Sequence, residues 1–261
     1  MKTIITSVFS ILITGISFSQ EQPDTTRINL GEKKILIVAN NDTIDADPDE
    51  DELKEIEAHW AGIEFGPTIL LNSTNGTSFP NDKQWENDPG KSFSWNANIL
   101  EHKFKIYKNY IGITTGLGFN WTQIGLKQSV LVSSPDSLYA FKDTVNTYSK
   151  NKLRAIYLTA PLMLEFCSKA DGEENSFYLS AGVIGGIRIG SSVKTTIEED
   201  KREVKEKNKG TFDLNSFRLD AAIKLGYADW GIFANYNVLP LFNMQKTTGV
   251  YPLTFGLSYN F

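Results

Sequence analysis

The chain has 261 residues, a net charge of −5 and a single cysteine, Cys167. The length suits one domain with a full core, or one barrel with long loops. The acidic balance argues against a nucleic-acid partner, because phosphate binding needs a basic face. One cysteine excludes an intramolecular disulfide and every multi-cysteine metal site, and a lone cysteine is more often a small buried hydrophobe than a nucleophile.

The first twenty residues have the features of a signal peptide. Lys2 supplies the positive start, Ile4–Ile16 the apolar stretch, and Ser17–Ser19 the small residues before a polar Gln20. The apolar stretch is too short to cross a bilayer as a helix, and no cysteine stands at the cleavage point to carry a lipid. The sequence therefore predicts an exported protein with residues 1–20 as its signal peptide.

Residues 21–57 form an acidic segment of their own. Within it, Arg27–Ala39 has two β-prone pieces around Gly31, which predicts a short hairpin. Asn40–Glu57 is dense in Asp and Glu, and a run of like charge usually stays solvated. The run does not fit a calcium-binding loop, because Glu50 stands where that loop needs glycine. We expect a periplasmic extension without a defined metal site, and weak divalent binding stays an alternative.

From residue 58 to residue 261, apolar residues recur at every second position, which is typical of β-strands. The pattern predicts eight strands: Ala61–Leu71, Ser92–Tyr107, Ile111–Thr122, Ile156–Phe166, Phe177–Ile189, Phe217–Tyr227, Trp230–Val238 and Leu253–Phe261. Only the second breaks the alternation, which predicts a β-bulge near Leu100. Each strand has about ten residues, enough to cross a bilayer at a tilt.

The two faces of these strands differ in a way that decides between kinds of β-protein. Large apolar residues fill one face, whereas Gly, Thr, Ser and Asn fill the other, with charges among them. A soluble sandwich turns its apolar face inward. A membrane barrel turns that face to lipid and keeps small or polar groups in a narrow lumen. The aromatic residues, 12% of the chain, gather near strand ends, as in the interfacial girdle of such barrels.

The connections between strands alternate in length. Long connections cover 72–91, 127–151 and 191–211, and short ones cover 108–109, 169–175 and 228–229. Outer-membrane barrels have long external loops and short periplasmic turns, and an even strand count leaves both ends on the periplasmic side. We therefore predict an all-β fold: an eight-stranded antiparallel transmembrane β-barrel over 58–261, in contact with outer-membrane lipid, with both termini in the periplasm.

Six charged residues fall on the predicted lumen face, and their signs balance. They are Glu64, Glu165, Arg188, Arg218, Asp220 and Lys224. Side chains just fill the interior of an eight-stranded barrel, and an unpaired buried charge is costly. The pattern therefore predicts a charge network that plugs the lumen. A narrow channel or transporter is the alternative.

No motif for catalysis, for a metal or for a cofactor is visible. The two histidines, His59 and His102, lack an adjacent serine and carboxylate motif. A lipid-modifying barrel enzyme would need such a cluster at one rim. A soluble lipocalin-like barrel would need its apolar face inward. Both stay alternatives to a non-enzymatic structural or interaction role, in which the loops or the N-terminal segment contact envelope proteins.

Several stretches resemble the PorT-like family of outer-membrane β-barrel proteins: YIGITTGLGFNW, YLTAPLMLEF, FYLSAGVIGGIRIG, LDAAIKLGYADWGIFANYNVLPLF and YPLTFGLSYNF. The resemblance covers roughly residues 58–261 and implies a barrel in the outer membrane. It also implies that the terminal Phe261 is the signal read by the outer-membrane assembly machinery. One branch of that family takes part in a protein-secretion apparatus, and the resemblance does not assign this chain to that branch.

Overall fold

The computed structural model describes residues 25–30, 33–38, 58–79, 85–108, 110–126, 130–133, 139–142, 148–169, 176–199, 202–244 and 247–261. The chain divides into two compact units, Met1–Glu52 and Leu53–Phe261. In the first, β1 (Thr25–Leu30) and β2 (Lys33–Val38) pair antiparallel, which confirms the predicted hairpin. The predicted signal peptide and the acidic run 40–57 lie outside the described residues. In the described part of the chain, no helix is long and apolar enough to cross a membrane.

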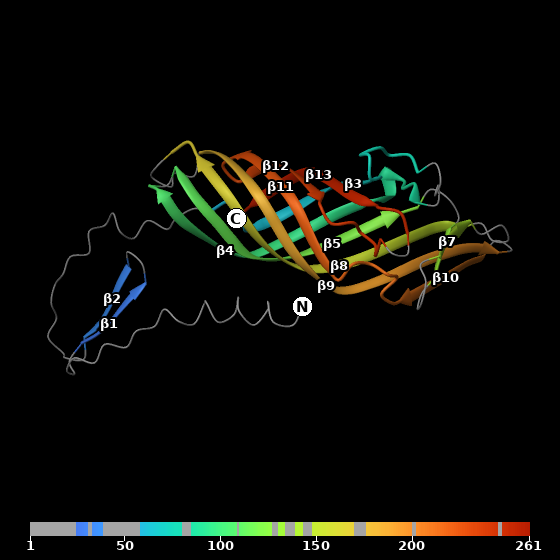
Figure 1. Ribbon diagram of the computed structural model, residues 1–261, viewed down its shortest axis with the longest axis horizontal. Helices are drawn as coiled ribbons and strands as arrows, with labels where there is room; N and C mark the ends of the chain where they lie inside the picture. The colour runs from blue at the N-terminus through green and yellow to red at the C-terminus, as the bar shows by residue number, and fades with distance from the viewer. Residues whose placement is uncertain are drawn as a thin grey trace. The chain divides into compact units, whose positions relative to one another are not determined.

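The second unit is a closed ring of antiparallel strands, seen from the side in Figure 1. In ring order the strands are β3 (Gly62–Leu71), β4 (Phe93–Tyr107), β5 (Ile111–Gly125), β8 (Tyr148–Cys167), β9 (Phe177–Glu199), β11 (Phe217–Tyr227), β12 (Trp230–Asn237) and β13 (Tyr251–Asn260). Each strand pairs with its neighbour in the chain, and β13 pairs back with β3 to close the ring. The predicted eight-stranded barrel is confirmed.

The two ends of the barrel differ. The short connections 108–110, 168–176 and 228–229 lie at one end, the turn end, and the long connections lie at the other, the loop end. At the loop end β9 continues past the ring and pairs with β10 (Arg202–Lys209), beside the extended β8 (Figure 1). Residues 148–151 and 191–199 belong to the long connections that the sequence predicts, and the mixed charge of 191–211 fits either an extended hairpin or a flexible loop. Both segments form strand because the β8–β9 ladder continues through them, even though their mixed polar residues carry little apolar periodicity.

Two short elements complete the long connections. The 3-10 helix η3 (Pro89–Lys91) precedes β4, and Asp88 caps it by accepting a hydrogen bond from the N–H of Gly90. The strands β6 (Val130–Ser133) and β7 (Tyr139–Lys142) form a hairpin between β5 and β8. The connections at the loop end therefore carry secondary structure of their own.

The polar face of the ring strands points inward and the apolar face points outward. On β3, Ile63 and Phe65 are 51% and 56% exposed, whereas Glu64 and Thr68 are 2% and 0% exposed. The same alternation runs along β8 and β11. The lipocalin-like alternative requires the opposite arrangement and is therefore wrong. An apolar outer wall of this kind is stable only where lipid, rather than water, surrounds it.

The irregular second strand has the expected bulge. The β4–β5 register shifts between Asn98 and Leu100, and again between Lys105 and Tyr107. After the first shift the parity of β4 changes, so that Lys103 is buried while Phe104 is 55% exposed. A single extra residue thus keeps the apolar side chains of both halves of β4 on the lipid side.

A core of apolar side chains closes the loop end, which we call the loop-end cap. Its members come from strand ends and from the long connections: Leu70, Phe79, Trp85, Ile124, Leu126, Leu153, Ala155, Tyr157, Val193, Phe212, Leu214, Leu241, Phe242 and Val250. Trp85 and Phe242 pack with ring centroids 4.3 Å apart, and each is 1% exposed. The long connections therefore fold inward over the barrel mouth.

Candidate functional site: the filled lumen

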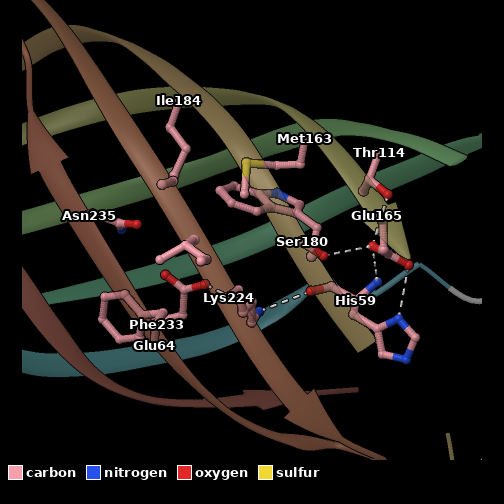
Figure 2. A pocket seen from close by; sticks show the side chains of 13 residues that line it. His59, Glu64, Thr114, Met163, Glu165, Ser180, Ile184, Lys224, Phe233 and Asn235 are labelled. Atoms are coloured by element: carbon pink, nitrogen blue, oxygen red, sulfur yellow. Dashed lines mark hydrogen bonds and ion pairs between the residues drawn. The ribbon is translucent and has the colours of Figure 1, made fainter. Parts of the chain in front are cut away.

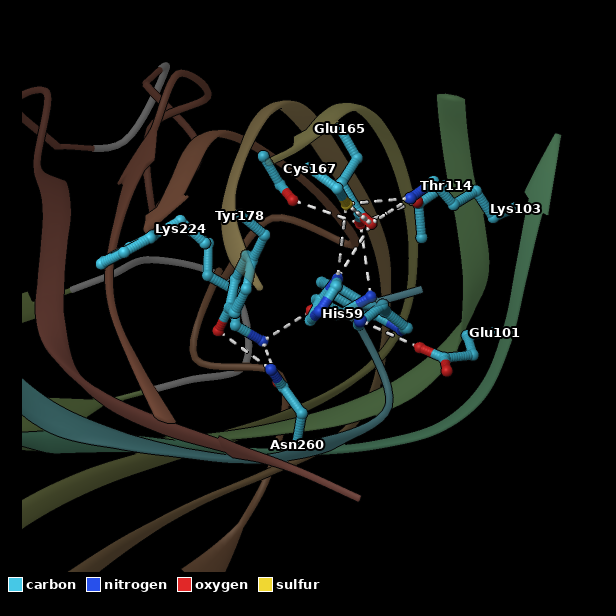
Figure 3. A network of polar contacts seen from close by, with 12 residues as sticks. His59, Glu101, Lys103, Thr114, Glu165, Cys167, Tyr178, Lys224 and Asn260 are labelled. Carbon is cyan, nitrogen blue, oxygen red and sulfur yellow. Dashed lines mark hydrogen bonds and ion pairs between the residues drawn. The ribbon is translucent and has the colours of Figure 1, made fainter. Parts of the chain in front are cut away.

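Glu165 is the centre of a polar group at the turn end of the lumen. It lies on the inward face of β8 and is 1% exposed. Its carboxylate contacts His59 Nδ1 at 3.0 Å, and it accepts hydrogen bonds from the hydroxyls of Thr114 (2.9 Å) and Ser180 (3.3 Å) (Figure 2). It also contacts Lys103 Nζ at 2.8 Å (Figure 3). Both oxygens of the buried carboxylate are thus bonded, as a buried charge requires. We call these five residues the turn-end cluster.

The turn-end cluster holds the segment that precedes β3 inside the barrel mouth. The His59 N–H donates to Glu165, and the Trp60 N–H donates to Glu101 at 2.9 Å. The His59 ring stacks on Tyr178 with centroids 4.0 Å apart, and the His59 carbonyl accepts a hydrogen bond from Lys224 at 3.0 Å (Figure 3). Backbone and side-chain contacts from four strands therefore fix this segment.

The space for this stack comes from glycine. Tyr178 packs against Gly226 on β11 and Gly231 on β12, and a Cβ at either position would overlap its hydroxyl oxygen. Its hydroxyl accepts a hydrogen bond from Asn260 at 2.9 Å. The Gly-rich inner face therefore serves to admit a large aromatic side chain into a narrow lumen.

His59 precedes the first membrane strand and has a strongly shifted pKa. Burial by itself lowers the pKa of His59, but hydrogen bonds with Cys167 and Glu165 and the Glu165 charge outweigh burial and raise the pKa to about 9. At neutral pH the imidazole is therefore protonated. The turn end then holds two cations, His59 and Lys103, against Glu165.

A second polar group fills the middle of the lumen. Arg218 and Asp220 form an ion pair in which the Arg218 Nε–H is shared between the two carboxylate oxygens, at 2.8 Å and 2.9 Å. The Arg218 guanidinium also donates to Asn120 Oδ1 at 2.7 Å and lies 5.5 Å from the Tyr157 ring centroid. Asn120 in turn donates to Asn96 at 2.5 Å. The chain of bonds crosses the barrel from β11 to β4.

Five of the six predicted lumen charges are buried inside the barrel. Arg218 pairs with Asp220, Lys224 Nζ lies 3.2 Å from Glu64, and Glu165 anchors the turn-end cluster. Arg188 is the sixth, and it does not join them. It is half-buried near the loop end, where it donates to Ser191 Oγ at 2.8 Å and to the Thr211 carbonyl at 3.3 Å.

The sequence reasoning missed two partners of Glu165. The predicted lumen charges do not include Lys103. The bulge in β4 is the signal for it, because the change of parity there turns Phe104 outward and therefore Lys103 inward. His59 precedes the first strand, where alternation gives no guidance. Of these two partners of Glu165, the sequence pattern therefore gives a signal for Lys103 but none for His59.

Little free space remains between the two polar groups. Trp60, Met163, Ile184 and Ala222 form an apolar layer there. The cavity beside it, lined also by Glu64 and by His59, Thr114, Glu165 and Ser180 of the turn-end cluster, has a volume of about 10 Å³ (Figure 2). This is about the room that one water molecule needs. In the described part of the chain, side chains fill the lumen from the turn end to the loop-end cap.

A ring of eight such strands, with lipid-facing apolar side chains and a polar filled interior, is the architecture of small outer-membrane barrels. Residues 61–246 match the family model of the outer membrane protein beta-barrel domain. The chain belongs to this family. As an outer membrane β-barrel protein it resides in the outer membrane, with β3–β5, β8, β9 and β11–β13 as its spanning wall.

Two solved structures are similar to this outer membrane β-barrel protein at low sequence identity. One is Ail, the attachment invasion locus protein of Yersinia pestis, with 14% identity over 77% of this chain and 99% of that one and a TM-score of 0.31. The other is Ail in complex with the heparin analogue sucrose octasulfate, with 13% identity over 77% of this chain and 96% of that one and a TM-score of 0.31. No curated protein matches the sequence.

Together with the neighbouring Cys167, the turn-end cluster also has features of a metal site and of a catalytic site. His59 Nδ1, a Glu165 oxygen and Cys167 Sγ lie within 4.8 Å of one another, so they could hold a metal ion. The Lys103 ammonium, however, lies 2.8 Å from Glu165 and 3.1 Å from Cys167, and it supplies the positive charge there. The residues present therefore fit an ion pair better than a metal.

The same geometry does not form a nucleophilic relay. In such a relay the imidazole stands between nucleophile and carboxylate and uses both ring nitrogens. Here Ser180 contacts Glu165 itself, and Cys167 Sγ lies 4.0 Å from Nδ1, the nitrogen that already bonds Glu165. We therefore assign these residues to holding the segment at His59 in place.

Phe261 follows the last strand at the turn end. Its side chain is 73% exposed, and its N–H donates to the Ala61 carbonyl at 3.3 Å. The terminal aromatic is therefore available at the barrel rim, next to the start of β3.

Proposed function

We propose that this outer membrane β-barrel protein is a closed anchor that presents an interaction surface at the cell envelope and conducts no solutes. The observation that supports the proposal is the filled lumen, in which the turn-end cluster, the Arg218–Asp220 pair and the loop-end cap follow one another. A solute channel needs a continuous water-lined path. The surface left for partners is then the loop end, where β8, β9 and β10 extend past the ring.

We further propose that the loop end faces outward and the turn end faces the periplasm. Long external loops and short periplasmic turns are the rule in bacterial outer-membrane barrels, and the connection 228–229 is only two residues long. Residues 21–57 then extend into the periplasm, where envelope proteins can bind them. Phe261, at the turn end, would meet the assembly machinery from the same side.

The PorT-like branch is our proposal for the chain's place within its family. It rests on sequence phrases such as YIGITTGLGFNW on β5 and YPLTFGLSYNF on β13. Both phrases set small residues toward the lumen and large apolar residues toward lipid, so they carry the barrel pattern more than a specific activity. Participation in a secretion apparatus does not follow from them.

Conductance in planar bilayers tests the closed lumen. The purified protein should give no steady solute-sized conductance at neutral pH, whereas a porin measured in the same membranes should conduct. Two variants form a matched pair: Glu165→Gln removes a charge that closes the turn end and should weaken this closure, whereas Leu257→Ala on the lipid face should leave the lumen as closed as in the unaltered protein. Steady opening by the unaltered protein would refute the closed anchor and favour a channel.

Labelling of intact cells tests the orientation. In a Cys167→Ser background, Lys205→Cys on β10 and Lys108→Cys at a short turn place one thiol at each end of the barrel. A membrane-impermeant maleimide should label the first variant on intact cells and the second only after the outer membrane is opened. The reverse result would place the loop end in the periplasm and remove its proposed role at the surface.

A further inference from the structure

The outer face of the loop end carries rows of basic residues. In the strand register, Lys152 on β8 lies opposite Lys194 on β9, and Lys194 lies opposite Lys207 on β10. In the next row, Arg154, Ser192 and Lys209 align in the same way. Residues directly opposite in antiparallel strands point to the same side of the sheet. Five cations therefore gather on one face over three strands.

These cations lack acidic partners in the described part of the chain. Of the lysines on β10, Lys205 pairs with Glu203, whereas no ion pair involves Lys152, Lys194, Lys207 or Lys209. Like charges directly opposite one another destabilise a sheet. A row of three lysines in register therefore costs stability unless an anion lies over it.

Next to the basic rows the wall is hollowed. A groove of about 720 Å³ is bounded on one side by Arg154, Lys207 and Lys209, and on the other by the aromatic residues Phe93, Trp95 and Trp121. Trp95 and Trp121 stack with centroids 4.0 Å apart and planes within 5°. The groove therefore has a cationic rim and an aromatic wall.

Arg154 is held in place for binding. Its Nε and a terminal nitrogen donate to Gln123 Oε1 at 2.9 Å and 2.8 Å, and Gln123 is fixed by its own hydrogen bond to the Lys91 carbonyl at 3.1 Å. A guanidinium held by a single neutral amide oxygen has N–H donors left for a ligand. Such an arginine suits phosphate, which it binds with paired hydrogen bonds.

The aromatic wall belongs to the face that lipid covers. Trp95 lies near the loop-end start of β4 and points to the same side as the exposed Ile99. Ile189, which lines the same groove, also points to this side. The groove thus opens across the boundary between the lipid-facing wall and the basic ribbon of β8, β9 and β10. A ligand that fills both parts must be apolar at one end and anionic at the other.

We propose that this groove binds the phosphorylated headgroup of a lipid in the leaflet at the loop end. Arg154, Lys207 and Lys209 contact the phosphate, Lys152 and Lys194 add to the local positive potential, and the lipid's apolar part lies against Trp95 and Trp121. Each basic residue near a membrane surface strengthens the binding of anionic lipid by a small, additive amount. The site would fix the depth of the extended ribbon at the membrane surface.

Native mass spectrometry of the purified barrel tests the proposal, with lipid A as the probe and with fully dephosphorylated lipid A and phosphatidylcholine for comparison. The unaltered protein should retain lipid A and lose both comparison lipids at lower collision energy. Lys207→Gln/Lys209→Gln should weaken lipid A binding about tenfold. The matched control Lys105→Gln/Lys108→Gln removes the same charge from exposed positions at the turn end and should change binding by less than about twofold.

Further arms separate charge from fold and lipid from free anion. Lys207→Arg/Lys209→Arg should keep binding, and all variants should keep the heat-dependent gel shift of a folded barrel. Trp121→Ala should weaken lipid A binding while the basic rim is intact. Displacement of lipid A by millimolar inorganic phosphate would show a site for free anions and overturn the lipid assignment. Equal retention of the dephosphorylated lipid, or equal loss in both double-glutamine variants, would also overturn it.

Discussion

The two ends of the lumen are closed by opposite chemistry. At the turn end, Glu165, Lys103 and His59 form a buried ion-pair group, and His59 and Trp60 are tied in by backbone hydrogen bonds. At the loop end the closure is apolar, and Trp85 and Phe242 pack at its centre. Ionic closure depends on each partner being present, whereas apolar closure depends mainly on filled volume.

This difference matches the two tasks of the ends. The turn end must hold one short segment in one position, and directional hydrogen bonds specify position better than apolar contacts do. The loop end gathers four long connections, and a packed apolar core can order several chains at once. Mutation should therefore distinguish the ends: the first should respond to the loss of a partner, and the second to the loss of volume.

The largest effect is expected at Glu165. Glu165→Ala removes the anion that lies against both Lys103 and His59, and the Lys103 ammonium then loses its carboxylate partner in a low-dielectric space. Loss of one partner of a buried pair costs about 3–5 kcal/mol. Urea unfolding in detergent micelles, followed by the heat-dependent gel shift, measures this loss.

The control for Glu165 removes Glu165 and Lys103 together, and the loss of Glu165 also removes contacts that keep His59 protonated. Glu165→Met/Lys103→Met replaces the pair by apolar side chains of similar length, and such a replacement is often neutral. The double variant should therefore recover most of the stability that Glu165→Ala loses. Equal destabilisation of the single and double variants would mean that packing, and not charge pairing, holds the turn end.

The loop-end cap should respond to volume alone. Phe242→Ala leaves a cavity beside Trp85 and should cost about 3 kcal/mol. Phe242→Leu keeps most of the volume and should cost about 1 kcal/mol. The same unfolding assay compares the two. A cost for leucine as large as for alanine would show that ring stacking, rather than filling, closes this end.

The sequence predicts the wall of this barrel better than its contents. Period-two alternation gives each strand and its lipid face, because lipid requires every outward side chain to be apolar along about ten residues. It also places Glu64, Asp220 and Lys224 inside. Alternation does not, however, give the position of a side chain along the barrel axis, so it cannot state which lumen charges contact one another. For this reason it assigns Arg188 to a network that Arg188 does not join.

The ends of the barrel were harder to predict for a physical reason. The loop-end cap is built from connections such as 72–92 and 238–250, where apolar residues have no period. Most residues of the β8–β9 extension are polar, and on its inner side only a few apolar residues such as Leu153 and Val193 join the loop-end cap, so its ladder of backbone hydrogen bonds leaves little trace in the hydropathy. His59 lies in the lumen because it bonds to Glu165, which is more than a hundred positions away in the sequence.

A pH dependence is expected at the turn end alone. The pKa of His59 is about 9 in the folded protein and about 6.5 when the residue is free. Because folding raises this pKa, protonation of His59 stabilises the barrel fully below about pH 6.5. The contribution is lost as the pH rises through about 9. These two pKa values give an expected loss of about 2–3 kcal/mol between pH 7 and pH 10.

His59→Gln tests this origin of the pH dependence. Glutamine keeps a hydrogen-bond donor near Glu165 but does not titrate, so the variant should be less stable than the unaltered protein at pH 7 and nearly equal to it at pH 10. Phe242→Leu serves as the counterpart from the loop end, because its loss of stability should be the same at both pH values. If His59→Gln retains the full fall in stability from pH 7 to pH 10, another group carries it, and the ionic closure of the turn end does not depend on a charged His59.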